Sequence, residues 1–230
     1  MNKRFYLVTT FILLYSFCIA QQSQWTKVSE SSGITVYTRP VKGSDLNEFK
    51  GITIINARLE VVGEVLRDID NYTAWVADIK ESSIIKKYNS DKMIIRLLQT
   101  APWPVNNREM ILTINSTNNY NKGIADIRFY AIELNDRPIN KGTVRITDMD
   151  GSYYLEYISR EKTRVTYTVR SNPGGALPSS IANMASRELP LRTLKGMATM
   201  VKQTKYIQLG NQSIDKNKIE EAIKNGQLLP

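Results

Sequence analysis

The run of strand-like segments between residues 82 and 170 limits the fold more than any other feature of this sequence. These segments are rich in β-branched and aromatic residues, and they read SSIIKKY, KMIIRLLQT, MILTIN, GIADIRFYAIE, GTVRITDM, SYYLEYIS and TRVTYTVR. Stretches rich in Asn, Asp and Gly separate them, as is typical of turns between strands. Because short turns join antiparallel neighbours, we expect an antiparallel sheet built as a meander.

The segments on either side of this run predict a hairpin before it and helices at both ends. GITVYTRP and LNEFKGITIINA flank the turn-forming VKGSD, which predicts a hairpin. Apolar residues recur at helical spacing from Leu59 to Ile69, and a second short helix is expected around NYTAWVAD. SNPGGALPSS then ends the sheet, and a long apolar helix follows that Pro190 is expected to kink. Its apolar side comprises Ile181, Met184, Ala185, Leu191, Leu194, Ala198 and Val201.

This order of elements predicts an α+β fold in which a curved antiparallel sheet wraps around one long C-terminal helix. The small helical pair would close one end, and one face of the sheet must be covered. By alternation, the residues facing inward are Ala125, Ile127, Phe129 and Ala131, then Met110, Leu112 and Ile114, then Val165, Tyr167 and Val169. One helix fills a curved sheet poorly, so we expect a hollow for an apolar ligand. A completely packed core fits the same residues about as well.

The N-terminus has the features of a secretory signal peptide. Lys3 and Arg4 precede an apolar run, and Ala20 precedes two glutamines, so we expect cleavage after Ala20 and a periplasmic or secreted protein. A membrane anchor is one alternative, although the run is shorter than the roughly 20 residues of a spanning helix. A lipid-modified Cys18 is another, which the bulky Phe17 disfavours. We expect a main domain over residues 21–208 and a polar tail over 209–230 with a short helix ended by Gly226.

Composition excludes several classes of catalyst. The chain has no His and a single Cys, Cys18, which the expected cleavage removes together with Lys3 and Arg4, leaving 29 basic against 22 acidic residues, or +7. A Ser-His-Asp arrangement, a Cys nucleophile and a zinc site of the usual ligands are therefore not expected. No metal and no cofactor are expected. The positive charge is scattered along the chain, which argues against a nucleic-acid partner.

Two motifs resemble those of the START family of lipid-transfer domains. They are APWPVNNREM, before a central strand, and SNPGGALPSSIANMASRELPLRTLKGM, at the passage from the last strand to the C-terminal helix. The resemblance extends less sharply from about Trp25 to Tyr206 and includes NYTAWVADIKESSII. It implies the helix-grip fold, with a tunnel for a lipid or sterol, here in a secreted bacterial member. Where the family has an Arg-Asp pair, this chain has Arg108 and Glu109.

Candidate site residues follow from alternation, helical spacing and these motifs. The cavity wall is expected to contain Trp75, Trp103, Met110, Leu112, Ile127, Phe129, Leu155, Tyr157, Tyr167, Ile181, Met184 and Leu191. A structural corner is expected at Pro102, Pro104, Arg108, Gly174 and Gly175. The two prolines would fix the backbone around Trp103, which we interpret as a buried corner anchor, and Arg108 has a fork that suits a carboxylate or backbone carbonyls.

These features predict a monomeric, non-catalytic carrier that binds a lipid or another apolar small molecule in an internal cavity, with a membrane surface as a further partner. An enzyme is the first alternative, because helix-grip proteins include cyclases, and its chemistry would rest on inward-facing Glu156, Tyr154 or Tyr167. A surface module that binds envelope lipids or a protein partner through its basic residues is the second.

Overall fold

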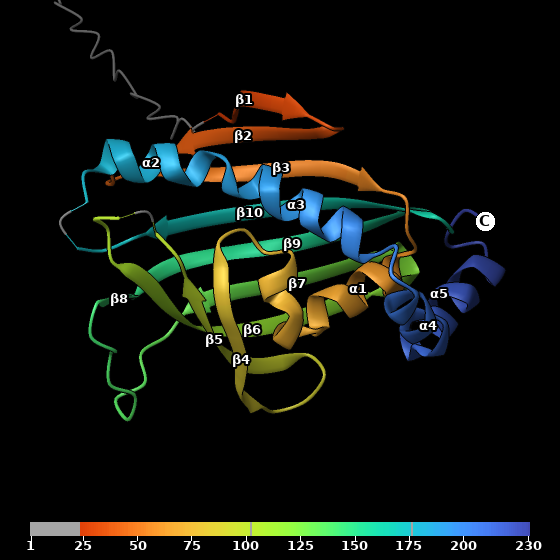
Figure 1. Cartoon of the computed structure of the whole chain (residues 1–230). Coiled ribbons are helices and arrows are strands. Elements are labelled where there is room, and N and C mark those ends of the chain that lie inside the picture. The colour runs from red at the N-terminus through yellow and green to blue at the C-terminus, as the bar shows by residue number, and fades with distance from the viewer. Residues whose placement is uncertain (1–23, 102, 176) are drawn as a thin grey trace, which may run out of the picture.

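The computed structural model describes residues 24–101, 103–175 and 177–230, and its sheet is the scaffold for everything else (Figure 1). The N-terminal half contains β1 (Thr26–Ser31), β2 (Ile34–Pro40), β3 (Asn47–Ile55), α1 (Leu59–Arg67), the 3-10 helix η1 (Ile69–Ala74), β4 (Ile79–Lys87), β5 (Lys92–Gln99) and β6 (Asn107–Asn119). The short 3-10 helix η2 (Tyr120–Lys122) leads to β7 (Ile124–Ala131), β8 (Thr143–Ile146), β9 (Asp148–Ser159) and β10 (Lys162–Asn172). Four helices follow: α2 (Ser179–Arg187), α3 (Leu189–Met200), α4 (Thr204–Gln212) and α5 (Ile214–Lys224).

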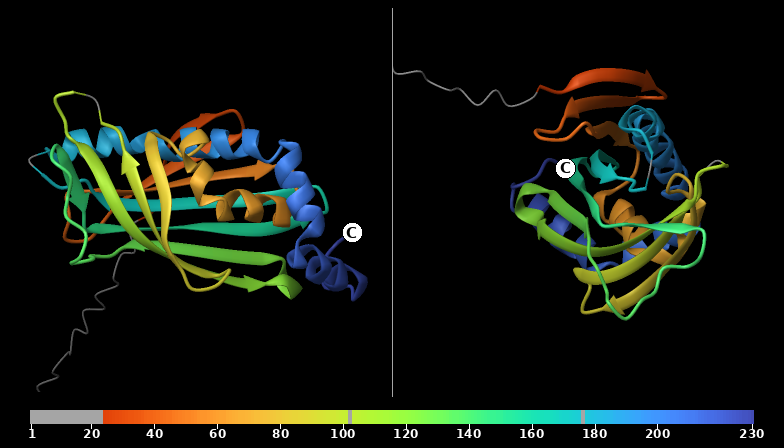
Figure 2. Two further views of the ribbon diagram at one scale, coloured as in Figure 1. Left: turned by 60° about the horizontal axis from the view of Figure 1, so that its bottom comes forward. Right: turned by 90° about the vertical axis from the view of Figure 1, so that its left-hand side faces the viewer.

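The strands form one 10-stranded sheet in the order β1-β2-β3-β10-β9-β7-β6-β5-β4. Every pairing along this path is antiparallel, and β8 adds a parallel pairing with the first residues of β6. Seen end-on in the right-hand view of Figure 2, the sheet curves, and α2 and α3 lie between its two sides. The predicted α+β, helix-grip architecture is confirmed.

The helix α3 approaches the sheet closely because glycines stand at its contacts. A Cβ atom on Gly51 of β3 would lie 2.7 Å from Leu194 Cδ1, and one on Gly196 would lie 2.3 Å from the carbonyl oxygen of Trp75. Because both positions are glycines and carry no Cβ atom, α3 packs closely against β3 on one side and against the end of η1 on the other.

The burial pattern follows the expected alternation. On β7, Ala125 and Phe129 are buried while Arg128 and Tyr130 are exposed, and on β10 the buried residues include Val165, Tyr167 and Val169. The strand β6 differs, because residues on both of its faces are buried between Arg108 and Ile114. The core cluster joins the inner face of the sheet to α1 and α3.

Several elements differ in detail from the sequence expectations. GTVRITDM divides into β8, which pairs with β6, and the start of β9, which pairs with β7 and β10. The long C-terminal helix is interrupted at Glu188, because Pro190 lies in the first turn of α3 and has no N–H to donate to the preceding turn. The strand β1 and the helix α4 were not expected from the sequence. The short helix expected in the tail is α5.

Candidate ligand-binding cavity

A cavity of about 220 Å³ lies between the inner face of the sheet and the α2–α3 pair. Most of its wall is aliphatic or aromatic, and the residues come from strands β3 to β10, from η1, from both helices and from the loops beside them. Apolar members of the wall include Ile95, Leu97, Met110, Leu112, Phe129, Met149, Val169 and Leu189. Such a wall offers an apolar molecule a place out of water.

Six of the residues predicted to line a cavity do line this one. They are Met110, Leu112, Ile127, Phe129, Tyr167 and Ile181. The first five occupy the inner face of the sheet, and Ile181 lies on α2 with 46% of its surface exposed. Ile181 therefore stands at the rim, where the cavity meets solvent. That any of these side chains contacts a ligand stays a prediction.

Trp103 is not a buried anchor, and this expectation is wrong. The side chain is 93% exposed in the loop between β5 and β6, next to Ala101 and Val105 on the cavity wall. The loop extends past the ends of both strands, and no helix or strand of the described residues covers the indole. Pro104 lies in the same exposed turn, whereas Pro102 lies outside the described residues.

Five further predicted wall residues lie elsewhere. Met184 is 69% exposed on the outer side of α2, and Leu191 is half-buried on α3 against the core cluster. Trp75 is buried one layer behind the wall, with its ring against those of Tyr72 and Tyr153. On β9, alternation turns Leu155 and Tyr157 inward, but both lie too far along the strand to reach the cavity.

Leu155 faces a smaller pocket of about 30 Å³ near α1, and the Tyr157 hydroxyl donates to the carbonyl of Leu229 at 2.8 Å.

Three buried tyrosines form the inner part of the wall. The rings of Tyr153 and Tyr167 stack with centroids 4.5 Å apart, and the Tyr72 hydroxyl donates to the carbonyl of Leu66 at 2.7 Å. Burial raises the pKa of all three phenols well above the ordinary value of 10, so each stays neutral at physiological pH. Tyr72 and Tyr153 were not among the wall residues predicted from the sequence. Alternation could have indicated Tyr153, because it shares the inward face of β9 with Leu155.

The carboxylate and phenol considered for catalysis on β9 point away from the cavity. Tyr154 and Glu156 alternate with the inward Tyr153 and Leu155, and neither lies on the cavity wall. Glu156 is placed 3.6 Å from Arg164 Nη1 in an ion pair between β9 and β10. The third candidate, Tyr167, does lie on the wall, where burial keeps its phenol neutral.

Arg108 joins the two motifs at the rim of the cavity. Its Nε donates to the carbonyl of Pro173 at 3.2 Å, and its Nη1 donates to the carbonyl of Asn106. Gly174 and Gly175 follow with φ of 64° and 70°, a left-handed backbone that glycine adopts without strain, so the expected turn is present. The structural corner thus uses Arg108 to hold backbone carbonyls.

Arg108 and Glu109 do not pair with each other, because adjacent residues of a strand face opposite sides. Glu109 points to the outer face, where Arg96 Nε lies 2.5 Å from Oε1 and Arg145 Nη2 lies 2.6 Å from Oε2. Burial acts to raise the pKa of Glu109, but hydrogen bonds from both arginines hold it below its ordinary value.

The two helices over the cavity are held differently. On α3, Arg192 donates two hydrogen bonds to the Asp78 carboxylate, at 2.6 and 2.5 Å, and the backbone N–H of Ala77 donates to Thr193 Oγ1 at 3.2 Å. On α2, Asn183 accepts from the N–H of Asn47 at 2.8 Å and donates to the carbonyl of Asp45 at 2.9 Å. The bidentate ion pair therefore secures α3, whereas α2 is tied to the β2–β3 hairpin by Asn183 and to β1 by Arg187, whose Nη2 donates to the carbonyl of Val28.

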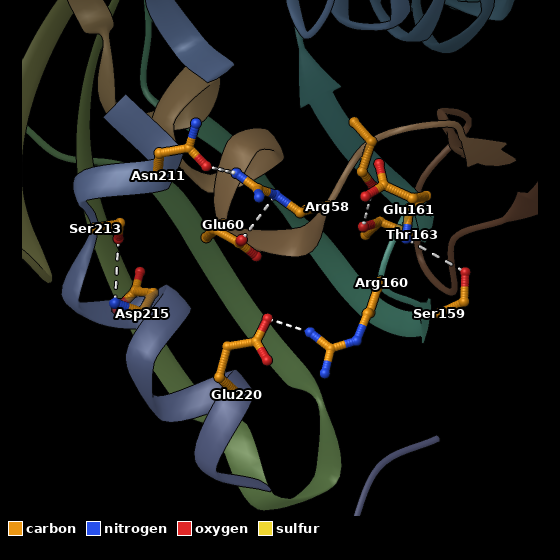
Figure 3. A network of polar contacts seen from close by, with 11 residues as sticks. Arg58, Glu60, Ser159, Arg160, Glu161, Thr163, Asn211, Ser213, Asp215 and Glu220 are labelled. Atoms are coloured by element: carbon orange, nitrogen blue, oxygen red, sulfur yellow. Dashed lines mark hydrogen bonds and ion pairs between the residues drawn. The ribbon is translucent and has the colours of Figure 1, made fainter. Parts of the chain in front are cut away.

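A separate polar network closes the end of the molecule near α1, α4 and α5 (Figure 3). Arg58 contacts Glu60 Oε1 at 3.0 Å and donates to Asn211 Oδ1 at 2.7 Å, while Arg160 pairs with Glu220. Burial raises the pKa of Glu60. These contacts join the C-terminal helices to α1 and to the β9–β10 turn.

Comparison with known proteins places the chain among relatives of the same architecture. The family model described as START domain matches residues 14–206. The chain belongs to the START domain family. An uncharacterised protein of Pseudomonas aeruginosa is 27% identical over 178 residues, which cover 77% of this chain and 87% of that protein. The phosphatidylcholine transfer protein of Mus musculus is 25% identical over 178 residues, which cover 76% of this chain and 82% of that protein.

A solved START structure agrees with this assignment. The STAR-related lipid transfer protein from Xanthomonas axonopodis superposes with a TM-score of 0.71 at 32% identity, covering 78% of this chain and 99% of that chain. Among the described residues, no helix combines the length and the apolar character needed to cross a bilayer. In the same part of the chain, no group of three or more His, Cys, Asp and Glu side chains is placed to hold a metal ion.

Proposed function

We propose that this START domain binds a lipid or another apolar small molecule in the cavity under α2 and α3, without chemical conversion. The observation that carries the proposal is the apolar cavity between the sheet and the helix pair. The relatives named for lipid or phosphatidylcholine transfer support it. Burial of an aliphatic chain contributes about 0.8 kcal/mol per methylene, so affinity requires no reactive group.

The size of the cavity favours a small ligand. Its volume of about 220 Å³ lies below the roughly 300–1,000 Å³ of usual small-molecule pockets. A single aliphatic chain or a compact ring system would fill it without movement of the walls, whereas a lipid with two long chains would require α2 to shift outward.

We propose further that the rim of the cavity docks on a membrane surface. Trp103 and Met184 are the most exposed large apolar residues near it, and Ile181 lies on the wall itself. Tryptophan favours the boundary between lipid and water, because its ring is apolar and its N–H is polar. A rim of this kind would let a ligand pass between bilayer and cavity without crossing water.

We also propose that the protein is exported, on the support of the basic, apolar and small-residue order of residues 1–20. Cell fractionation followed by N-terminal sequencing tests this step. Recovery from the periplasm or medium with Gln21 as the first residue is expected, and recovery of an uncleaved chain from the cytoplasm would contradict it.

The experiment for ligand binding is native mass spectrometry of protein purified from its own source, followed by transfer of the co-purified molecule between vesicles. A bound apolar molecule of constant mass, released intact on denaturation, is expected. Protein that carries no such molecule and takes up none from a lipid extract would contradict the proposed function.

A further inference from the structure

Among the described residues, the cavity wall carries a buried cation, Arg108, that has no counter-ion. Arg108 is 7% exposed, and it is the arginine among the described residues that falls in the buried class. Within that part of the chain its guanidinium donates to two backbone carbonyls and has no carboxylate partner. Residues 1–23, 102 and 176, which the structure does not describe, contain neither Asp nor Glu.

The carboxylate next to Arg108 in the chain and the one on the cavity wall already have cationic partners. Glu109 follows it in the chain but lies on the outer face between Arg96 and Arg145. Asp78 is the carboxylate on the cavity wall, and Arg192 neutralises it with a bidentate ion pair. The wall therefore presents a net positive charge at Arg108.

A buried charge of this kind is normally paired, because removing it from water is costly. Burial lowers the pKa of Arg108, but a guanidinium is so strongly basic that it remains a cation at physiological pH. A ligand that brings its own anion would supply the missing partner.

The neighbours of Arg108 suit a polar head group. Gln99 lies opposite Arg108 in the β5–β6 register and therefore on the same face, and both residues are on the cavity wall together with Ser171. Deeper residues of the same strands, such as Met110, Leu112 and Ile95, are apolar. One end of the cavity thus offers a cation and an amide, and the rest offers hydrocarbon.

We propose that the ligand is an amphiphile with an anionic head group, a carboxylate or a phosphate, held by Arg108 at the rim while its chain lies in the apolar part of the cavity. This inference rests on the proposed function and adds the charge of the ligand to it. Arg108 then determines specificity: it selects by head group, whereas the hydrocarbon contacts accept any chain of suitable length.

Calorimetric titration of the lipid-stripped full chain with twelve-carbon amphiphiles below their micelle concentrations tests the proposal. Dodecanoate and dodecyl phosphate are expected to bind about tenfold or more tightly than dodecanol, as a charge-assisted hydrogen bond would give. Dodecyltrimethylammonium is expected to bind most weakly. Equal or tighter binding of dodecanol would overturn the proposal. Binding of none of the four would overturn the proposed function as well.

Variants assign the preference to Arg108. In Arg108→Gln the ratio between dodecanoate and dodecanol is expected to fall to about one with dodecanol binding kept, and Arg108→Lys is expected to retain part of the preference. Arg128→Gln, on the exposed outer face of β7, is the matched control and should leave the ratio unchanged. A preference that survives in Arg108→Gln would refute the assignment.

Two further measurements distinguish head-group binding from a folding defect and from a site for free anions. If Arg108→Gln does not fold, the head-group series on the natural chain and on Arg108→Lys decides. Inorganic phosphate and acetate, at the concentrations used for the amphiphiles, are expected not to displace dodecanoate. Displacement by either would indicate a site for a free anion and would also overturn the proposal.

Discussion

At the scale of single residues, two neighbours on β6 have opposite surroundings. Alternation sends Arg108 to the cavity and Glu109 to the outer face, where it bridges Arg96 and Arg145. The side chain of Glu109 is almost fully buried, and so is that of Arg145. This carboxylate therefore pairs with a cation from β5 and one from β8 and joins these strands to β6, while Arg96 has a second carboxylate partner in Glu81.

Replacing Glu109 by Gln should lower the free energy of unfolding by about 3–5 kcal/mol, because the buried guanidinium of Arg145 loses its carboxylate partner, whereas Arg96 keeps its ion pair with Glu81. Urea denaturation measures this. The control is Glu220→Gln, which breaks the half-exposed pair with Arg160 and should cost no more than about 1 kcal/mol. Equal losses in the two variants would contradict the importance given to burial.

The same carboxylate predicts a pH dependence. The pKa of Glu109 is lower in the folded chain than its ordinary value of 4.5, so the folded state binds fewer protons in the acid range. Its stabilisation is complete above about pH 4.5 and is lost as the pH falls through the lower folded pKa. Denaturation between pH 7 and pH 3 should show the difference between the natural chain and Glu109→Gln shrinking below about pH 4.5. A constant difference would contradict this prediction.

Trp103 should matter for membrane association and not for stability. Because the indole is exposed, Trp103→Ala should change the free energy of unfolding by less than about 0.5 kcal/mol, and it should weaken vesicle association severalfold. Flotation with liposomes measures the association. Tyr88→Ala removes a half-exposed aromatic side chain just beyond the opposite end of β5 and serves as the control. Equal loss in both variants would argue against the rim as the docking surface.

At the scale of elements, α2 and α3 form one helical arm with two different attachments. The Asp78–Arg192 ion pair and the close contact of Gly196 with Trp75 hold α3. The helix α2 has half-exposed and exposed residues on most of its length, with Ala182 as its buried position. Because few contacts secure it, α2 is the part of the cover that can move at low cost.

The two apolar residues of α2 should respond differently to enlargement. Ile181→Trp places extra volume at the rim of the cavity, so it should reduce uptake of a fluorescent fatty acid at least severalfold with little change in melting temperature. Met184→Trp, on the same helix but off the cavity wall, should leave stability and uptake from solution, without vesicles, unchanged. Strong destabilisation by Ile181→Trp would indicate a solid core at this end.

At the scale of the whole molecule, α5 extends the structure past the residues that the family model matches. It is attached through Asp215, which accepts from the Tyr120 hydroxyl and lies 2.5 Å from Arg67 Nη2. Ile219 and Ala222 of the same helix are buried against the domain. Burial and the contact with Asp215 raise the pKa of Tyr120, so its phenol remains a donor at physiological pH.

A chain that ends at Gln212 should keep its fold but lose stability. The truncation removes Asp215, the partner of Arg67 and Tyr120, and exposes the surface that Ile219 covers. Asp215→Asn alone should cost about 1–3 kcal/mol, and the truncation should cost more. Chemical denaturation with circular dichroism compares the two. A truncated chain as stable as the full one would show that α5 does not support the domain.

Local patterns in the sequence determined most of the elements and their faces, with β1 and α4 as exceptions. The alternation of Ala125, Phe129 and their outward neighbours, and the helical spacing from Leu59 to Ile69, specify which side of each element is apolar. Turn residues such as Gly174 and Gly175 mark where the sheet ends. These signals act over a few residues, so they are readable without the fold.

Only the tertiary structure decided which inward residues reach the cavity. Phe129 and Leu155 both face inward, yet Phe129 lies under α2 and α3 and Leu155 lies near α1. Which inward residues line the cavity depends on where the helices cross the strands, and the sequence of a strand does not show this. Trp103 is exposed since, in the described part of the chain, no helix or strand covers its loop. That Arg108 lacks a counter-ion was equally hidden, because a carboxylate can come from any part of the chain, and strand pairing brings Glu109 to Arg96 and Arg145 instead.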